Sequence, residues 1–354
     1  MRRNGERLGV IGAGNIGGAI AMNLVADGHR VVVHDADPRR CGALVVAGAA
    51  VAANPAEVAA ESAITFTSLP GPAAMEAVAG QWLEAAPRGA VLVDLTTNAP
   101  TTVRRVGDRF AAAERGLLEA PLSGGAIGAQ NRQLVFMTGG DRAIYERCLP
   151  LLRTLGRATF HLGPLGAGNT AKLVNSLLAF SATWSSLEGL AIAVKGGLDL
   201  RMMVEVVRTA GAGNFFTDRM VEGINERGRP TQFALGLAAK DAGLLLDVAR
   251  DTAVPTPLAT AVAEALSAAV GAGLGERDFT DLVELIERQA GVTLWIAPRA
   301  PAVRSCRRRR SRPSSSRSSS SSSSVCSGRG PTSTSGAAAS ALSLSSPRSA
   351  GRTS

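Results

Sequence analysis

The sequence predicts an α/β protein in which a doubly wound sheet is followed by an all-α domain, with a long helix joining the two. Short β-branched runs alternate with alanine-rich helical patterns from residue 8 to about residue 162. This alternation is typical of strands and crossover helices in a parallel sheet. Strand patterns then stop after Pro164-Leu165-Gly166, and helical patterns continue to about residue 289. The first and longest helix is expected over 169–194, where the pair Gly196-Gly197 ends it.

Positive charge in this chain comes almost entirely from arginine. Of 38 basic residues only three are lysines, namely Lys172, Lys195 and Lys240. Codon bias explains the rarity, but it does not explain why three positions keep an amine. A lysine amine can lose its proton inside a protein, whereas a guanidinium cannot. Lys172 and Lys240 are therefore candidates for chemistry, with survival by chance as the alternative, whereas Lys195, just before Gly196, is expected to interact with the C-terminal dipole of the long helix.

The C-terminal segment differs in composition from the rest of the chain. From residue 296 to residue 354 there are eleven arginines and no acidic residue, and without them the net charge is about −2. We expect 295–354 to be a disordered Ser/Arg-rich tail, because it has too few apolar side chains to offset the entropy of ordering. It is either a nucleic-acid or localisation arm or a fortuitous extension. The helical run RDFTDLVELIERQ before it ends naturally, which favours the second.

Compartment and membrane signals are few. Four cysteines form no metal-binding spacing and no disulfide framework. The N-terminus leads directly into a glycine-rich turn and lacks the apolar core of a signal peptide, so we expect a cytoplasmic protein. The most apolar segment, residues 173–194, carries an Asn, several Ser and Glu188, which indicates a buried core helix and no membrane span.

A glycine-rich turn follows the first predicted strand. In LGVIGAGNIGGAI the glycines have the spacing G-x-G-x-x-G between a strand and a helix. This context predicts a Rossmann-type dinucleotide site, because the turn brings backbone N–H groups and a helix N-terminus to the pyrophosphate. The residues expected to bind the cofactor there are Gly12, Gly14, Asn15, Ile16 and Gly17.

The end of the second predicted strand bears on the choice of cofactor. Asp35 lies 23 residues after Gly12, where a carboxylate accepts hydrogen bonds from the adenosine ribose and repels a 2′-phosphate. This favours NAD over NADP. Arg39 and Arg40 are the counter-argument, since either could reach a phosphate; solvated residues opening the next helix are the alternative.

Two later loops lie at the carboxyl ends of predicted strands, where ligands bind in open α/β sheets. They are Ser68-Leu69-Pro70 and the segment 96–100, TTNAP. Ordinary helix starts at Pro72 and Pro100 explain part of this composition. We also predict that Leu69, Pro70 and Thr97 contact the cofactor.

Four segments in order resemble the signature regions of the β-hydroxyacid dehydrogenase family, which includes 3-hydroxyisobutyrate dehydrogenase and tartronate semialdehyde reductase. They are GAGNIGGAIAMNLVADGH from residue 12, EAPLSGG from residue 119, GAGNTAKLVN from residue 166 and FALGLAAKD from residue 233. The resemblance covers residues 8 to about 290. Four motifs in the right order are far more specific than one.

The resemblance implies a fold, an activity and site residues. It implies a Rossmann domain at 1–165, an all-helical substrate and oligomerisation domain at 166–294, and oxidation of a small 3-hydroxy acid to its semialdehyde. Lys172 is then the acid/base, and Lys240 closes the pocket beside both substrate and cofactor. The residues implied to hold the substrate carboxylate are Ser123, Gly124 and Gly125. The long apolar helix favours a homodimer or homotetramer.

Residue chemistry agrees with the role implied for Lys172. Oxidising an alcohol requires a base to take the hydroxyl proton as hydride leaves, and the reverse reaction requires an acid. A buried lysine near a second cation has a lowered pKa and serves both purposes. An arginine would hold the oxygen without exchanging the proton. Ser123 and its glycines offer a hydroxyl and approachable N–H groups to a carboxylate.

The sequence departs from the family pattern in three places. The family has Asn-Asn three and four residues after the lysine, and here Asn175 is followed by Ser176, whose shorter reach leaves substrate identity open. Ile16 stands where methionine is common. Arg132 stands where glycine is usual, and it either adjusts a turn or adds a cation near the site.

Two alternative functions are compatible with the sequence. An imine reductase would have the same fold, but those enzymes typically lack this lysine. A catalytically silent scaffold would use the arginine-rich tail to bind nucleic acid. Retention of Ser123, Lys172 and Lys240 argues against the scaffold, and so does the slightly acidic core.

Overall fold

The computed structural model describes residues 7–296. The first half of this described chain contains one mixed sheet. Its strands are β1 (Arg7–Ile11), β2 (Arg30–His34), β3 (Ala50–Val51), β4 (Ile64–Thr67), β5 (Val91–Asp94), β6 (Gly116–Glu119), β7 (Leu122–Ser123), β8 (Leu134–Gly140) and β9 (Gly156–His161). They lie in the order β3-β2-β1-β4-β5-β6-β8-β7, and β9 pairs with β8. The predicted tail, apart from residues 295 and 296, lies outside the described residues.

The sheet is parallel over its first six strands and mixed beyond them. β1 to β6 are all parallel, whereas β8 runs antiparallel to both β6 and β7. The predicted doubly wound fold is confirmed, but the alternation of strands and helices did not reveal this reversal. The chain reverses between β7 and β8, because the segment 124–133 that joins them is shorter than the dozen or more residues of a crossover.

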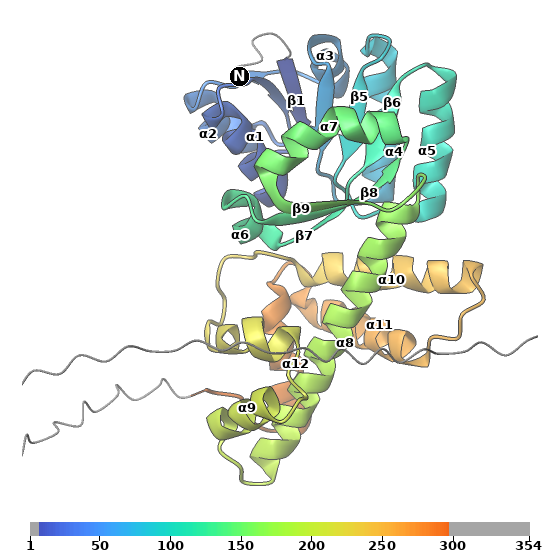
Figure 1. The fold of residues 1–354 in the computed structure, drawn as a ribbon. Coiled ribbons are helices and arrows are strands. Elements are labelled where there is room, and N and C mark those ends of the chain that lie inside the picture. Colours follow the sequence, from blue (N-terminus) through green and yellow to red (C-terminus); the bar gives the residue numbers. More distant parts are fainter. Residues whose placement is uncertain (1–6, 297–354) are drawn as a thin grey trace, which may run out of the picture. The chain divides into compact units, whose positions relative to one another are not determined.

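Helices cover both faces of the sheet (Figure 1). They are α1 (Asn15–Ala26), α2 (Gly42–Val46), α3 (Pro55–Glu61), α4 (Pro72–Ala85), α5 (Pro100–Ala112), α6 (Gly125–Gln130) and α7 (Arg142–Leu155). Successive strand residues enter different cores: Val31 and Val33 belong to the core that includes α1 and α7, whereas Val32 belongs to the core that includes α3 and α4. This alternation follows from the period of two in a strand, and it explains why the strands are apolar throughout.

Helix starts in this half follow from local sequence. Proline occupies the first position of α3, α4 and α5, where its missing N–H costs no hydrogen bond. Asn54 caps α3 by accepting a hydrogen bond from Glu57 N, and Asp141 caps α7 in the same way. Of these helices, α4 and α5 begin at the edge of the sheet where the loops after β1, β4 and β5 meet, whereas α7 follows the antiparallel β8 and begins at the opposite edge.

The second half of the described chain is helical. Its helices are α8 (Ala167–Lys195), α9 (Leu200–Thr209), α10 (Leu235–Asp251), α11 (Pro257–Ala269) and α12 (Leu282–Ala290). Phe180 of α8 packs on Phe233 and Phe279 with ring centroids 6.3 and 5.3 Å away. All described residues belong to one compact unit, so the predicted division at residue 165 stays a prediction.

The segment between α9 and α10 was not predicted. It forms two short helical turns, η2 (Phe216–Met220) and η3 (Val221–Asn225). The Asn214 side chain accepts hydrogen bonds from Phe216 N and Thr217 N, which supports the first turn. A side-chain cap of this kind leaves no periodic pattern in the sequence, so hydrophobic spacing alone could not reveal it.

Between residues 7 and 296, two helical stretches are long and apolar enough to cross a membrane, judged by length and composition alone. They are Ala167–Lys195 and Pro257–Leu274. The first contributes Phe180, Leu187 and Leu190 to the core of the helical half. A core helix passes the same test, and the packing of α8 agrees with the core-helix prediction.

Candidate active site

The glycine-rich turn between β1 and α1 leaves no room for side chains. Gly12 has φ +91°, and a Cβ there would lie 2.2 Å from Ser68 O. A Cβ on Gly17 would lie 1.9 Å from Gly12 O. Gly14 precedes α1 in an extended conformation, so N–H groups at the helix start are open to an anion. Such a cradle fits the pyrophosphate of a dinucleotide.

Asp35 supports this turn directly. One carboxylate oxygen accepts a hydrogen bond from Ala13 N at 2.6 Å, and the other accepts one from Asp37 N at 2.8 Å. Each carboxylate oxygen has a second lone pair, so a ribose hydroxyl can still donate to it. Asp35 therefore lies beside the glycine turn, where its predicted role places it.

The two arginines after Asp35 differ in position. Arg39 donates from Nε and Nη2 to the Asp37 carboxylate at 2.8 and 3.0 Å. Arg40 lies over the glycine turn, with Nη1 3.2 Å from the position of a Cβ on Gly14. Arg40 is thus the arginine near the cradle, and Asp37 already neutralises Arg39.

The loops after β4 and β5 lie together. Leu69 N donates to Thr96 Oγ1 at 3.1 Å. Behind them the buried Asp94 carboxylate accepts hydrogen bonds from Thr67 Oγ1, Thr96 N and Asn98 Nδ2 at 2.8, 3.1 and 2.7 Å. Burial raises the pKa of Asp94 to about 6, and these donors oppose the rise. Asp94 therefore holds the Thr96–Asn98 loop in shape.

Lys240 joins α10 to both loops. Its Nζ donates to Thr97 O at 2.8 Å, and its Cδ lies 3.1 Å from the position of a Cβ on Gly71, two residues after Leu69. The adjacent Pro70 is exposed. The structure thus brings Leu69, Thr97 and Lys240 together, although 143 residues separate Thr97 from Lys240.

Lys172 is half-buried on α8, and its burial favours the neutral amine. Burial lowers the pKa of Lys172 most; the Asp241 carboxylate opposes this, and the Lys240 ammonium adds to it. Asp241 is 2% exposed and pairs with Lys240 Nζ at 2.9 Å. Sequence reasoning gave Asp241 no role. Its position directly after Lys240, within a largely apolar helix, was the available signal.

Ser123, Gly124 and Gly125 occupy the turn from β7 into α6. Ser123 pairs with Val135 of β8, and the two glycines have φ +124° and +60°, which other residues rarely adopt. The Ser123 side chain is half-buried, and both glycines are exposed. Within residues 7–296 no hydrogen bond links Ser123 to Lys172 or Lys240, so the carboxylate-binding role stays a prediction.

The residues three and four positions after Lys172 on α8 lie in different surroundings. Ser176, one helical turn from Lys172 on the same face, is 3% exposed, whereas Asn175 is exposed. Ile16 is half-buried and packs against the core beneath α1. The predicted contacts of these three residues with ligands stay predictions.

Arg132 lies at the end of α1 and makes local contacts there. Its guanidinium donates to both Asp27 oxygens at 2.7 and 2.8 Å and to the carbonyls of Asn23 and Thr154. Its φ is +58°, the region in which glycine is favoured. Of the two alternatives, Arg132 therefore adjusts a turn, and it does so by binding the C-terminus of α1.

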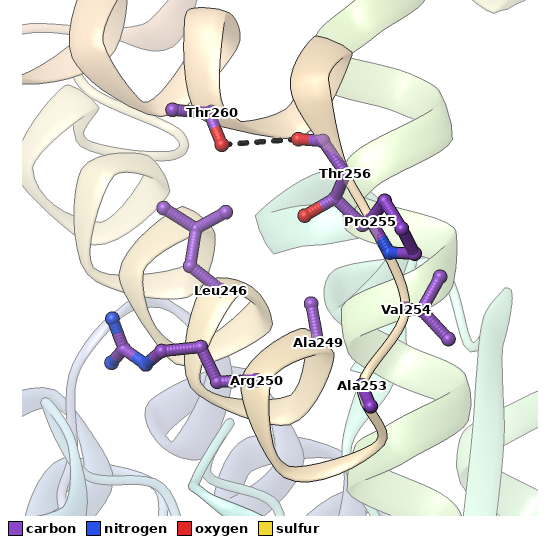
Figure 2. Close-up of a pocket in the computed structure, with 8 residues that line it drawn as sticks. All are labelled: Leu246, Ala249, Arg250, Ala253, Val254, Pro255, Thr256 and Thr260. Atoms are coloured by element: carbon purple, nitrogen blue, oxygen red, sulfur yellow. Dashed lines mark hydrogen bonds between the residues drawn. The ribbon is translucent and has the colours of Figure 1, made fainter.

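Other features of the described chain carry no comparable chemistry. A surface hollow of about 510 Å³ lies where α10 leads into α11, lined by apolar residues such as Leu246 and Val254 (Figure 2). Its one charged residue, Arg250, pairs with Asp247. Within residues 7–296 no group of three His, Cys, Asp or Glu side chains could hold a metal.

Comparison with known proteins covers both halves of the chain. Residues 7–163 match the family described as the NAD binding domain of 6-phosphogluconate dehydrogenase. Residues 166–286 match the family described as NAD-binding of NADP-dependent 3-hydroxyisobutyrate dehydrogenase. Each match contains one half of the site, with Asp35 in the first and Lys172 and Lys240 in the second.

Individual relatives match this chain over nearly their whole length. A 2-(hydroxymethyl)glutarate dehydrogenase of Eubacterium barkeri is 32% identical over 81% of this chain and 97% of its own. An NAD-dependent L-serine dehydrogenase of Pseudomonas aeruginosa is 32% identical over 81% of this chain and 99% of its own.

Solved structures have the same fold as this chain. A 3-hydroxyisobutyrate dehydrogenase of Mycobacterium tuberculosis, solved with L-serine, has a TM-score of 0.73 and 27% identity over 79% of this chain and 99% of its own. An imine reductase of Streptomyces aurantiacus has a TM-score of 0.56 at 23% identity, covering 79% and 99%, which shows a shared fold alone.

Proposed function

The chain belongs to the β-hydroxyacid dehydrogenase family, and we propose that it interconverts a small 3-hydroxy acid and the matching semialdehyde, with Lys172 as the general acid/base. It is an oxidoreductase of the 3-hydroxyacid dehydrogenase type whose cofactor is NAD or NADP. NAD is the proposed preference, because Asp35 lies beside the glycine turn.

The observation that carries the proposal is the half-buried Lys172 beside Lys240 and Asp241. A bound nicotinamide dinucleotide accepts hydride in oxidation and donates it in reduction. As the substrate carbon loses hydride, the neutral Lys172 amine takes the hydroxyl proton and becomes an ammonium. In reduction the Lys172 ammonium returns that proton to the developing alkoxide.

Three further residue groups orient the reactants. Ser123, Gly124 and Gly125 offer a hydroxyl and backbone N–H groups to the substrate carboxylate. Lys240 holds the Thr97 carbonyl and lowers the pKa of Lys172. The residues proposed to hold the dinucleotide are Gly12, Gly14, Asn15, Ile16, Gly17, Asp35, Leu69, Pro70, Thr97 and Lys240. Asn175 and Ser176 of α8 are proposed to contact the substrate.

The first test is a spectrophotometric screen. It offers 3-hydroxyisobutyrate, L-serine and 2-(hydroxymethyl)glutarate to the full chain with NAD and with NADP. Lys172→Ala and Lys172→Arg should both lower kcat by about 100-fold to 10,000-fold, the range of general acid–base catalysis, and leave dinucleotide binding nearly unchanged. Near-normal turnover by Lys172→Arg would exclude the proton-transfer role, because arginine keeps its proton.

The pH dependence supplies a second, independent readout. The pKa of Lys172 is lowered from 10.5 by burial, so the neutral amine forms below that pH. Oxidation needs the amine and should rise with pH through this pKa. Reduction needs the ammonium and should fall over the same range. Identical profiles in both directions would contradict the assignment.

The alternatives give different results in one experiment. Removing residues 297–354, which keeps the buried Ile296, should leave hydroxy-acid turnover unchanged if the described fold is the enzyme. A silent scaffold would instead show no turnover, with nucleic-acid binding that depends on the removed segment. An imine reductase would reduce a cyclic imine and survive Lys172→Ala.

We also propose a homodimer or homotetramer. Large apolar side chains are exposed along α8 and α9, including Leu178, Ile192 and Met202 at 65%, 72% and 63%. Exposed apolar surface of this kind marks association sites. Light scattering on the eluted protein should give two or four chain masses, and a monomer at micromolar concentration would refute this.

A further inference from the structure

Glu119 is a buried carboxylate that the reaction scheme does not use. It ends β6 and is 0% exposed. Its Oε1 accepts hydrogen bonds from Gly166 N and Gly168 N at 2.6 and 2.9 Å. Its Oε2 accepts hydrogen bonds from Asn169 N and Asn169 Nδ2 at 3.1 and 2.6 Å. The carboxylate of Glu119 thus binds the first turn of α8, the helix that carries Lys172.

The hydrogen-bond pattern identifies the ionised form of Glu119. All four partners are N–H donors, and a protonated carboxyl would direct its own hydrogen at one of them. Burial raises the pKa of Glu119 above its usual value, and the Asn169 amide and the backbone N–H groups oppose this rise without reversing it. Within residues 7–296 no lysine or arginine forms an ion pair with Glu119. The N-terminus of α8 therefore provides the balancing positive charge.

Two glycines make room for this carboxylate. A Cβ on Gly139 of β8 would lie 2.2 Å from Glu119 Oε1. A Cβ on Gly168 of α8 would lie 2.4 Å from Met137 O and 3.2 Å from Glu119 Cδ. Any side chain at either position would displace the helix or the carboxylate. Gly168, in the motif GAGNTAKLVN, thus lets α8 approach β8 and Glu119.

Asn169 extends the contact to the loop after β5. Its Oδ1 accepts a hydrogen bond from Asn98 N at 2.7 Å, while its Nδ2 donates to Glu119. Asn98 also donates to Asp94, which is paired in register with Glu119 on the neighbouring strand. One asparagine side chain therefore bridges a buried carboxylate, the Thr96–Asn98 loop and the start of α8.

Lys172 lies one helical turn beyond Asn169. The same loop that Asn169 binds through Asn98 N receives Lys240 through the Thr97 carbonyl. The helix that carries Lys172 is thus bound to Asn98 of this loop, and Lys240 of another helix is bound to the adjacent Thr97. A change at the first turn of α8 changes the distance from Lys172 to that loop.

We propose that Glu119 and Asn169 are positioning residues that set the height of Lys172 above the Thr96–Asn98 loop. This inference rests on the proposed role of Lys172. Without the carboxylate or the amide bridge, the N–H groups of the first turn lose their partners and the turn frays. Displacement of a catalytic group by about 1 Å lowers turnover by up to about 100-fold.

The kinetic test uses Asn169→Ala and Glu119→Gln in the full chain. Asn169→Ala should lower kcat by about 10-fold to 100-fold, with KM for hydroxy acid and dinucleotide nearly unchanged, because the loss is in alignment. The primary deuterium isotope effect on kcat should rise with a substrate deuterated at the oxidised carbon, since the chemical step becomes rate-limiting. If Glu119→Gln does not fold, Asn169→Ala alone decides.

Thr65→Val is the matched control for lost stability. It removes a buried hydroxyl on β4 that accepts a hydrogen bond from Trp82 Nε1 at 2.9 Å, away from α8. It should unfold at a lower denaturant concentration and keep kcat. The proposal is overturned if Asn169→Ala keeps its kcat, or if Thr65→Val loses as much kcat as Asn169→Ala.

A second readout does not depend on turnover. The chain has only three lysines, so labelling with [ε-¹³C]lysine yields three side-chain signals, which Lys172→Arg and Lys240→Arg assign. In Asn169→Ala the Lys172 signal should shift or split, while that of Lys195 stays in place. An unchanged Lys172 signal overturns the inference. A changed signal in a protein that turns over no hydroxy acid means that only the proposed function has failed.

Discussion

The dinucleotide cradle and the reaction centre are built in opposite ways. The cradle comes largely from one short stretch, since Gly17 lies against the Gly12 carbonyl and the Asp35 carboxylate binds Ala13 N within about one crossover unit. The reaction centre takes Thr97 from a loop after β5, Lys172 from α8, and Lys240 with Asp241 from α10. The first depends on local backbone geometry and the second on long-range packing.

The two regions also differ in how they use charge. The described cradle presents backbone N–H groups, with Asp35 bound to backbone at its edge. The reaction centre is surrounded by buried ionisable groups, and burial shifts the pKa values of Lys172, Asp94 and Glu119. Mutations in the cradle should therefore alter binding, and mutations in the centre should alter rate and pH dependence.

The largest effect on dinucleotide binding should follow Gly17→Ala. A Cβ would lie 1.9 Å from Gly12 O, so the turn must open and its N–H groups no longer converge. Dinucleotide affinity should fall by about 100-fold or more, the order of several lost charge-assisted hydrogen bonds. Calorimetric titration with NAD measures it. Gly42→Ala, where a Cβ meets nothing within 4 Å, is the control, and equal affinity in both variants would end the local-geometry argument.

Lys240→Met should lower kcat by about 10-fold or more and should shift the pH at which the oxidation rate rises. Lys240 lowers the pKa of Lys172, and Asp241 raises it. Removing Lys240 therefore raises the pKa of Lys172, and the rise in oxidation rate moves to higher pH. Steady-state profiles of kcat/KM measure this shift. Lys195→Met should leave the pH of this rise unchanged. If Lys240→Met also leaves it unchanged, Lys240 does not influence the pKa of Lys172.

Cofactor choice should respond to Asp35 and Arg40 in opposite directions. Asp35→Ala should weaken NAD binding and relax the preference toward NADP by about 10-fold, the order of one charge-assisted hydrogen bond. Arg40→Ala should weaken NADP binding alone, because Arg40 lies over Gly14. Arg39→Ala, with its guanidinium on Asp37, is the control. A wild-type enzyme that already prefers NADP would contradict the proposed role of Asp35.

Apart from binding and rate, the protonation of Asp94 should affect the stability of the fold near the reaction centre. The pKa of Asp94 is raised from 3.8 to about 6 by burial, so the folded state binds more protons between these values. Its contribution to stability therefore falls as pH rises from about 4 to 6, by up to about 3 kcal/mol. Urea unfolding should show that Asp94→Asn lacks this fall. The exposed Asp108→Asn should retain it, and parallel curves for Asp94→Asn and wild type would refute the effect.

Helix and strand positions were predictable to the extent that they depend on local pattern. The long helix was expected over 169–194 and spans Ala167–Lys195, and the glycine pair after it ends it as expected. The reversal of β8 and the turns after Asn214 were not predicted. They depend on strand pairing and side-chain caps, which have no period in the sequence.

Site residues divide in the same way. The glycine turn, Asp35, Lys172 and Lys240 were singled out because each belongs to a short motif. Asp241, Asn169 and Glu119 were given no role, although all three lie inside quoted motifs. Their importance rests on contacts with residues 47 to 71 positions away, or on the pair that Asp241 makes beside Lys172.

The sequence by itself determined the fold class, the glycine cradle and the identity of the lysines, because spacing, composition and residue chemistry are local properties. Only the tertiary structure decided that Arg40 and not Arg39 lies over the cradle, that Arg132 binds the end of α1, and that Glu119 holds the helix of Lys172. These outcomes depend on how closely segments that are distant in the sequence approach one another in the folded chain. Close approach between distant segments is a property of packing, and no single segment carries it.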